Sequence, residues 1–103
     1  MKLVIGIPAY NEEKNIEKIL LMLRPITDMI IVCDDGSSDL TSEIAEKFGV
    51  ILVKHQRNLG YGGAIRSIFA KAREVGADIL VTFDADGQHR VQDIRPKIGR
   101  AHV

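Results

Sequence analysis

The chain of 103 residues has no long hydrophobic run, no excess of charge of either sign and a single cysteine. No apolar stretch approaches the roughly 18 residues that a membrane-spanning helix requires. The 14 Lys and Arg balance the 14 Asp and Glu, which argues against a domain that mainly grips nucleic acid or an anionic membrane. Cys33 has no partner for an internal disulfide, and the N-terminus lacks a signal-peptide pattern. We therefore expect a reduced, cytoplasmic chain.

Apolar residues make up 46% of the sequence and charged residues 27%, which is typical of one small globular domain covering residues 1–103. Short β-branched runs predict strands at 3–7, 29–33, 50–54 and 79–83. Amphipathic spacing predicts a helix between a cap at Asn11 and a stop at Pro25, then helices over 40–48, capped by Asp39, and over 62–75. A less regular last helix is predicted between Val91 and Ile98.

Strict alternation of strands and helices, with connections too long for hairpins, predicts a three-layer α/β/α domain with a mostly parallel sheet. Ligands of such sheets bind beyond the carboxyl ends of the strands, where the strand order reverses. Polar residues follow all four predicted strands, in the segments 8–12, 34–39, 55–58 and 84–89. A candidate binding site is therefore expected at this edge of the sheet.

Four aspartates stand at the predicted strand ends: Asp34, Asp35, Asp84 and Asp86. Carboxylates gathered at one edge repel one another, and a divalent cation would neutralise them. Asp84 and Asp86 flank Ala85 after an apolar strand, and Gln88 could add a neutral oxygen, a donor set that suits a hard cation. The alternative for this short motif is an Asx-turn pair that opens a loop.

Asp35 suits the N–H donors of a nucleobase or the hydroxyls of a ribose, and its alternative role is the capping of a turn. Cys33 is expected to be a small buried residue whose backbone lines the site. The run from Gly60 to Ala64 does not match the G-x-G-x-x-G pattern, because Ile65 takes the last glycine position. Helix packing and a tight turn explain most of its glycines. The helix start near Gly62 could still bind an anion. The three histidines, 55, 89 and 102, lack metal-ligand spacing.

Read together, the segments IPAYNEE, VCDDGSSD, NLGYGGAIR and FDADGQH closely resemble the family 2 glycosyltransferases, in particular the branch of the dolichol-phosphate mannose synthases. The resemblance covers residues 1–90 and implies the GT-A fold, a GDP- or UDP-linked sugar donor, and Mg²⁺ or Mn²⁺ as cofactor. It also implies inverting transfer of the sugar to an acceptor such as a polyprenyl phosphate, which would bring the chain to a membrane.

Carried over by position, the resemblance implies two sets of site residues. The nucleotide-sugar would contact Pro8, Ala9, Tyr10, Glu12, Cys33, Asp35, Asp84 and Ala85. The metal ion would be held by Asp84, Asp86 and Gln88.

Members of the resembled family continue well beyond the length of this chain. We therefore expect the donor-binding half of a truncated domain, with the acceptor half and any general base beyond Val103. The catalytic residue is accordingly not assigned. Without a later strand, the segment 79–83 would be an open apolar edge, which predicts a homodimer or higher oligomer, joined through this strand or by exchange of the C-terminal segment.

Three alternatives belong to other functional classes. A haloacid dehalogenase-type phosphatase also places Asp-x-Asp-Gly after a strand, but Gln88 follows the glycine and only 17 residues follow Asp86. A calcium loop would need a helix rather than a strand before it. A donor-binding fragment that folds and dimerises without turnover is the strongest alternative. Asp35 suits uracil and guanine alike, so the base, the sugar and the acceptor stay open.

Overall fold

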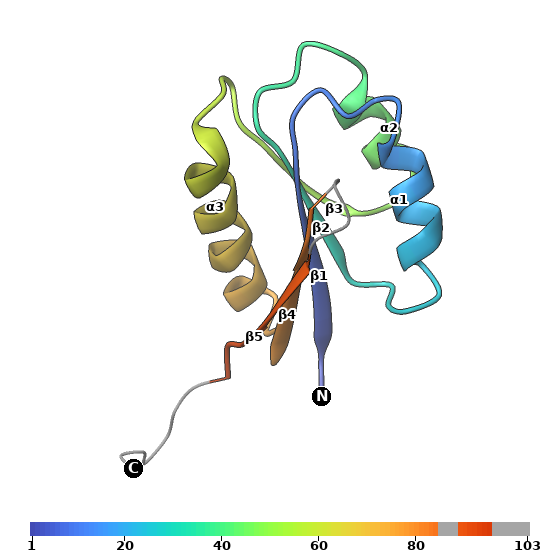
Figure 1. Ribbon diagram of the computed structural model, residues 1–103. Helices are drawn as coiled ribbons and strands as arrows, with labels where there is room; N and C mark the ends of the chain where they lie inside the picture. Colours follow the sequence, from blue (N-terminus) through green and yellow to red (C-terminus); the bar gives the residue numbers. More distant parts are fainter. Residues whose placement is uncertain (85–88, 96–103) are drawn as a thin grey trace.

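The computed structural model describes residues 1–84 and 89–95 (Figure 1). Strands and helices alternate as the periodicity predicts, and a fifth strand follows. In chain order the elements are β1 (Leu3–Ala9), α1 (Ile16–Leu23), β2 (Ile30–Asp34), α2 (Thr41–Lys47), β3 (Ile51–Lys54), α3 (Gly60–Glu74), β4 (Ile79–Phe83) and β5 (His89–Asp93).

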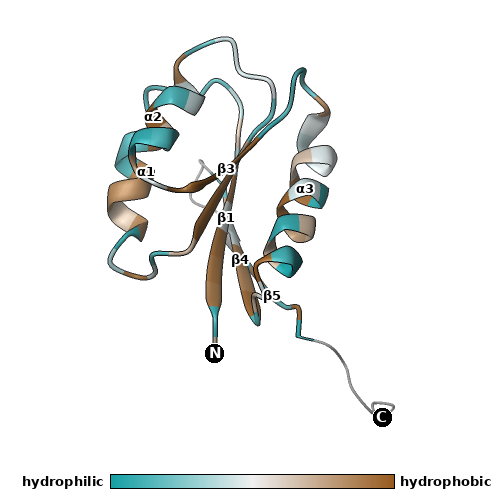
Figure 2. Cartoon of the chain, turned by 180° about the vertical axis from the view of Figure 1, so that it is seen from behind, coloured by the Kyte–Doolittle hydropathy of each residue, from teal (hydrophilic) through white to brown (hydrophobic). Residues whose placement is uncertain are grey.

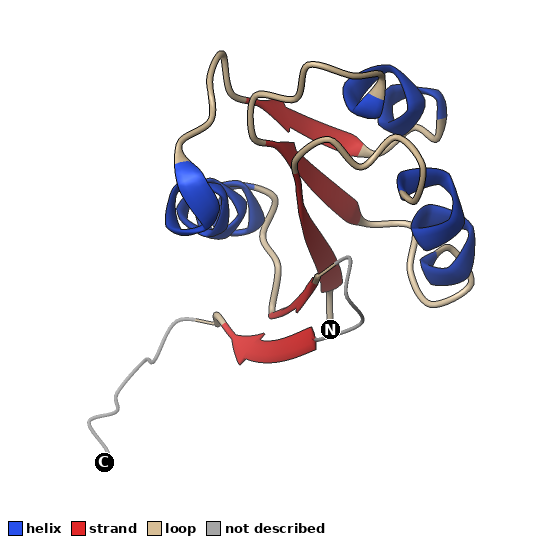
Figure 3. Ribbon diagram, turned by 45° about the horizontal axis from the view of Figure 1, so that its top comes forward, coloured by secondary structure: helices blue, strands red, loops and turns tan. Residues whose placement is uncertain are grey.

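The strands form one sheet in the order β3-β2-β1-β4-β5. The first four run parallel, and β5 pairs antiparallel with β4. Helices α1 and α2 cover one face of the sheet and α3 covers the other (Figure 3). The predicted three-layer, mostly parallel α/β architecture is confirmed. The strand order reverses at β1, because the chain moves outward to β2 and β3 and then returns through α3 to β4 on the other side.

The alternation of side chains along the strands separates the core into two apolar layers. Ile5, Ile7 and Ala9 of β1 face α1 and α2, whereas Val4 belongs to the layer under α3. The four parallel strands are accordingly brown along most of their length in Figure 2. A β-carbon added at Gly6 would lie 2.4 Å from Cγ2 of Ile68. Glycine therefore lets α3 pack close against the middle of the sheet.

The helix starts differ from the sequence predictions in detail. Asn11 does not cap the first helix, because it lies five residues before Ile16 in a left-handed conformation, with φ 53°. Its side-chain Oδ1 instead accepts the N–H of Ser38 at 2.9 Å. Asp39 lies one residue before the N-cap position of α2, and its Oδ1 accepts the N–H of Thr41 at 3.0 Å.

The end of the described chain corrects two predictions. The helix expected between Val91 and Ile98 is wrong, because residues 89–93 form β5 and residues 96–98 lie outside the described residues. The segment Ile79–Phe83 is not an open edge, because β4 lies between β1 and β5. Pairing with β5 satisfies the backbone groups that were expected to seek a partner, so the expected route to a homo-oligomer through this strand loses its basis.

Across residues 1–84 and 89–95, no helix combines the length and the apolar character that a bilayer crossing demands.

Candidate functional site

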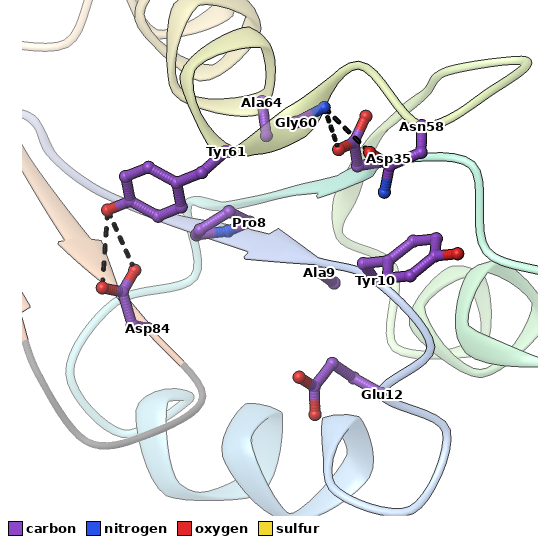
Figure 4. Close-up of a pocket in the computed structure, with 10 residues that line it drawn as sticks. All are labelled: Pro8, Ala9, Tyr10, Glu12, Asp35, Asn58, Gly60, Tyr61, Ala64 and Asp84. Atoms are coloured by element: carbon purple, nitrogen blue, oxygen red, sulfur yellow. Dashed lines mark hydrogen bonds between the residues drawn. The ribbon is translucent and has the colours of Figure 1, made fainter.

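A cavity of about 460 Å³ opens at the carboxyl ends of β1, β2 and β4, next to the start of α3 (Figure 4). This is the edge of the sheet where the sequence predicts a ligand. Six of the predicted site residues line the cavity, and so do four that sequence reasoning did not place there. The lining residues are Pro8, Ala9, Tyr10, Glu12, Asp35, Asn58, Gly60, Tyr61, Ala64 and Asp84.

The remaining predicted site residues fall into two groups. Cys33 is fully buried and does not line the cavity; it belongs to the apolar layer under α3, as expected for a small core residue. Burial, and then the negative charges of Asp35 and Asp34, raise the pKa of the Cys33 thiol to about 12. Ala85, Asp86 and Gln88 lie outside the described residues.

The loop after β1 forms one wall of the cavity and is tied to the loop after β2. The backbone N–H of Asp35 donates to the carbonyl of Ala9 at 2.8 Å, which extends the pairing of the two strands. Further hydrogen bonds run from Asn11 N to Ser37 Oγ (2.7 Å), from Glu12 N to Thr41 Oγ1 (2.8 Å) and from Leu40 N to Glu13 Oε1 (2.9 Å). These hydrogen bonds fix the loop that carries Tyr10 and Glu12 against the segment that follows β2.

Asp35 is buried at one end of the cavity, and three donors converge on its carboxylate. Oδ1 accepts the N–H of Leu59 at 2.8 Å and lies 2.7 Å from Nδ1 of His55. Oδ2 accepts the N–H of Gly60, the first residue of α3, at 2.9 Å. Burial raises the pKa of Asp35, but the hydrogen bonds from His55, Leu59 and Gly60 outweigh it and hold the pKa below its usual range.

Of the two roles that the sequence left open for Asp35, the capping of a turn is observed, because its carboxylate accepts the N–H of Gly60. The contact with a base or ribose stays a prediction, made for a residue that lines the cavity. The sequence also allowed an anion site at the start of the third helix, with Arg57 close by. Two of the N–H groups at this helix start are already occupied by Asp35. The first N–H groups there, those of Leu59 and Gly60, point at an internal anion, the carboxylate of Asp35.

Asp34 does not join the predicted group of carboxylates at the site. Side chains alternate along a strand, so Asp34 faces α2 while Asp35 faces α3. The Asp34 carboxylate is buried, accepts the hydroxyl of Ser42, and accepts the N–H of Ser37 at 3.0 Å. Its hydrogen bonds stabilise the turn after β2, and the side chain does not line the cavity.

Asp84 lies across the cavity from Asp35, at the end of β4 (Figure 4). The hydroxyl of Tyr61 donates to its two carboxylate oxygens at 3.3 and 3.4 Å. Within the part of the chain that the structure describes, no three His, Cys, Asp or Glu side chains gather as a metal site. Asp84 is the described member of the predicted metal set, and a carboxylate at a cavity wall is a donor that fits Mg²⁺ or Mn²⁺.

Sequence reasoning missed Asn58, Gly60, Tyr61 and Ala64 as cavity residues and assigned no role to His55. All five belong to one stretch, from the residue after β3 into the second turn of α3. The sequence did offer a signal, because a polar strand end precedes a glycine-rich helix start there. This stretch was set aside as a ligand site because it does not match a phosphate-loop pattern.

The fold and the cavity define an α/β domain with a cavity at the carboxyl edge of its parallel strands. Residues 4–102 match the model of the family described as Glycosyl transferase family 2, and the chain belongs to this family. It is 44% identical over 106 aligned residues to a UDP-N-acetylglucosamine--dolichyl-phosphate N-acetylglucosaminyltransferase of Methanococcus voltae, covering 85% of this chain and 42% of the relative.

Other relatives agree. A dolichol-phosphate mannosyltransferase of Pyrococcus furiosus is 32% identical, covering 95% of this chain and 29% of that enzyme. Among solved structures, glucosyl-3-phosphoglycerate synthase from Mycobacterium tuberculosis, in complex with Mn²⁺, uridine diphosphate and glucosyl-3-phosphoglycerate, superposes with a TM-score of 0.68 at 27% identity, over 82% of this chain and 33% of that one. The GT-A fold is confirmed. The chain spans less than half the length of these relatives.

Proposed function

We propose that this domain binds a nucleotide-diphospho-sugar in the cavity at the sheet edge and serves as the donor-binding part of a metal-dependent, inverting glycosyltransferase. One observation carries the proposal: the cavity has a buried hydrogen-bond acceptor, Asp35, at one end and a carboxylate, Asp84, at the other. A nucleotide-diphospho-sugar has a matching polarity, because its base offers N–H donors and its diphosphate is held through a cation.

The base end is built for recognition. Asp35 supplies a fixed acceptor inside the cavity, and Tyr10, a residue that is 49% exposed, offers its ring as a face for the planar base. Pro8 and Ala9 form the floor, because they end β1 between the two walls. The side chain of Cys33 is buried in the apolar layer under α3 and does not line the cavity, so in this proposal only its backbone is available to the nucleotide.

The diphosphate end holds the cofactor in this proposal. Asp84, together with Asp86 and Gln88 outside the described residues, would bind Mg²⁺ or Mn²⁺, which neutralises charge on the departing nucleoside diphosphate. The Tyr61 hydroxyl contacts both oxygens of Asp84 and so steers that carboxylate within the cavity. Crystallisation of the synthase from M. tuberculosis with Mn²⁺ and uridine diphosphate supports this assignment.

The acceptor is proposed to be a polyprenyl phosphate. The names of several relatives specify dolichyl or undecaprenyl phosphate as the group that receives the sugar. A phosphate oxygen is already deprotonated at neutral pH, so the chemistry of such an acceptor requires no general base. It would also bring the transfer reaction to a membrane surface.

A second candidate function is donor binding without turnover. The chain spans 42% of its relative from M. voltae, and activity of that whole enzyme does not establish activity of this part. Both functions require the donor site, and they differ only in whether nucleoside diphosphate is released when a polyprenyl phosphate is added.

Titration calorimetry with UDP, GDP and their sugar conjugates, with and without Mn²⁺, tests the proposal. We expect one nucleotide series to bind, and Asp84→Asn or Asp86→Ala to weaken the metal-dependent part by about ten-fold or more. Asp28→Asn is the matched control, because Asp28 is exposed and remote from the cavity lining. Binding that ignores Mn²⁺ and both site variants would refute the metal assignment, and no binding at all would refute the function.

A further inference from the structure

His55 lies directly behind Asp35 and is held on three sides. It follows the last residue of β3, and its backbone N–H donates to the carbonyl of Asp34 at 2.9 Å. Ring atom Nδ1 lies 2.7 Å from Oδ1 of Asp35, and Nε2 lies 2.8 Å from the hydroxyl oxygen of Ser67 on α3. The side chain is 10% exposed. Both nitrogens therefore have fixed partners, and the ring has one orientation.

The partners also determine where the ring proton sits. An ionised carboxylate only accepts hydrogen bonds, so Nδ1 carries the proton that points at Asp35. Nε2 then accepts from the hydroxyl of Ser67 in the neutral ring, or donates to it in the charged ring. In either state His55 donates to Oδ1 of Asp35.

The acceptor capacity of Asp35 is consequently almost used up. Each carboxylate oxygen has two lone pairs. Oδ1 receives Leu59 N and His55 Nδ1, while Oδ2 receives Gly60 N. One acceptor position remains, on Oδ2, in a residue that is 4% exposed and lines the cavity.

We propose that His55 is a positioning residue for base selection, which restricts Asp35 to one free acceptor and thereby favours uracil over guanine. Uracil presents a single imide N–H between two carbonyl groups, and Oδ2 can accept it. Guanine presents an N–H and an adjacent amino group, and pairing both would need both carboxylate oxygens. With Oδ1 filled by His55 and Leu59, the guanine amino group loses its partner in a buried site, which is unfavourable. The inference rests on the proposed role of Asp35 as the base contact.

Two substitutions of His55 distinguish its hydrogen bond to Asp35 from its contribution to packing. The amide nitrogen of Asn superposes on Nδ1 of histidine, so His55→Asn keeps a donor to Asp35. The amide of Gln reaches the position of Nε2, so His55→Gln keeps the contact with Ser67 and loses the donor to Asp35. Both variants remove one ring and add one amide, which makes each the control for the other.

The probes are UDP, GDP and UDP methylated at N3 of uracil, titrated in the presence of Mn²⁺. The wild-type chain is expected to bind UDP at least about ten-fold more tightly than either of the other two, the value of one hydrogen bond to a charged group. His55→Asn should keep these ratios. His55→Gln should reduce the preference for UDP over GDP to about three-fold or less, because Oδ1 of Asp35 becomes free for a second donor. The preference over N3-methylated UDP should persist, because Oδ2 still accepts the imide N–H.

The possible results distinguish the inference from the function on which it rests. If the wild type does not discriminate UDP from the N3-methylated analogue, Asp35 does not read the base, and that part of the proposed function fails. If the wild type discriminates and His55→Gln keeps the same preference for UDP over GDP, Asp35 selects the base without His55, and the inference alone is overturned. Wild-type binding of GDP as tight as that of UDP overturns it as well.

A measurement on the unaltered chain covers the case in which His55→Gln does not fold. In ¹⁵N-labelled protein, the Nδ1–H resonance of His55 should shift when UDP is added, because the base then shares the carboxylate that this proton contacts. The N3-methylated analogue should leave it in place. A UDP-independent resonance would overturn the inference without any variant.

Discussion

Asp35→Asn should destabilise the fold even without a ligand, because the carboxylate starts α3. Three donors meet it: His55 Nδ1, Leu59 N and Gly60 N. An amide at this position has one accepting oxygen, which can keep Leu59 and His55, but its NH₂ group faces the N–H of Gly60. Gly60 N has a second acceptor in Oδ1 of Asn58 at 3.0 Å. The variant thus loses one hydrogen bond and the charge on two others.

The magnitude follows from these contacts. Hydrogen bonds to charged groups contribute about 1.5–3 kcal/mol each, and Oδ1 of Asn58 remains an acceptor for the N–H of Gly60. We expect the free energy of unfolding to fall by about 1.5–3 kcal/mol, a large fraction of the roughly 5–15 kcal/mol that stabilises a typical domain. Urea unfolding followed by far-ultraviolet circular dichroism at neutral pH measures this loss. Glu46→Gln, an exposed carboxylate on α2, is the control and should change stability by less than about 0.5 kcal/mol.

The pH dependence of the loss provides a second check. The folded-state pKa of Asp35 is depressed: burial works against this, and the hydrogen bonds from His55, Leu59 and Gly60 prevail. Its stabilisation is therefore fully present above the unfolded pKa of about 3.9 and is lost as the pH falls through the lower folded pKa. The pKa of Asp39 is lowered too: burial raises it, but hydrogen bonds, first among them that of Thr41, outweigh the burial. Because Asp39 is the same in the wild type and in Asp35→Asn, its contribution to the pH dependence cancels in the difference between them.

The gap between wild type and Asp35→Asn should accordingly be constant near neutral pH and shrink below about pH 4, where the protonated carboxyl resembles the amide. An unchanged urea midpoint at neutral pH would refute the capping role of Asp35. A gap that stays the same at low pH would show that the loss comes from packing and not from the charge.

Three further predictions concern the core and its edges. Gly6→Ala should cost about 1–3 kcal/mol, because its β-carbon would lie 2.4 Å from Cγ2 of the buried Ile68; an unaltered melting temperature would contradict this. Ser42→Ala should cost about 1–3 kcal/mol by removing a donor from the buried carboxylate of Asp34, and an equal urea midpoint would count against it. Cys33, buried and with its pKa raised to about 12, should react with a thiol reagent at pH 8 only as the chain unfolds; rapid labelling of the folded protein would exclude this.

The sequence carried most of the fold because its strands and helices are local patterns. The period-two and period-3.6 spacings located β1 to β4 and α1 to α3 within a few residues. The last segment failed for a physical reason: β5 exists through its pairing with β4, Val81 opposite Val91, and this non-local contact leaves no periodicity in five residues. The open-edge prediction failed with it.

The site was predictable in position and less so in the orientation of its side chains. Strand ends of a parallel sheet meet at one edge, so Asp35 and Asp84 were expected there. That Asp34 turns away from the cavity was available from the strand alternation, since neighbours on a strand face opposite sides. The donors to Asp35 were not available, because Leu59 contributes only a backbone N–H and lies 24 residues away in the chain.

The arrangement around Asp35 joins the stability of the fold to the proposed recognition of the base. The carboxylate is oriented by the start of α3 and by His55 before any ligand arrives, so binding does not need to order it. A base that donates to the free position on Oδ2 adds a fourth contact to the same group and should raise the unfolding temperature. Weaker binding in a variant of Asp35 or His55 therefore has two sources, a lost contact and a loosened helix start. A nucleotide that lacks the imide N–H separates these two effects. Its binding depends on an ordered start of α3 but includes no hydrogen bond from the base to Asp35, so a variant weakens it only through the loosened helix start.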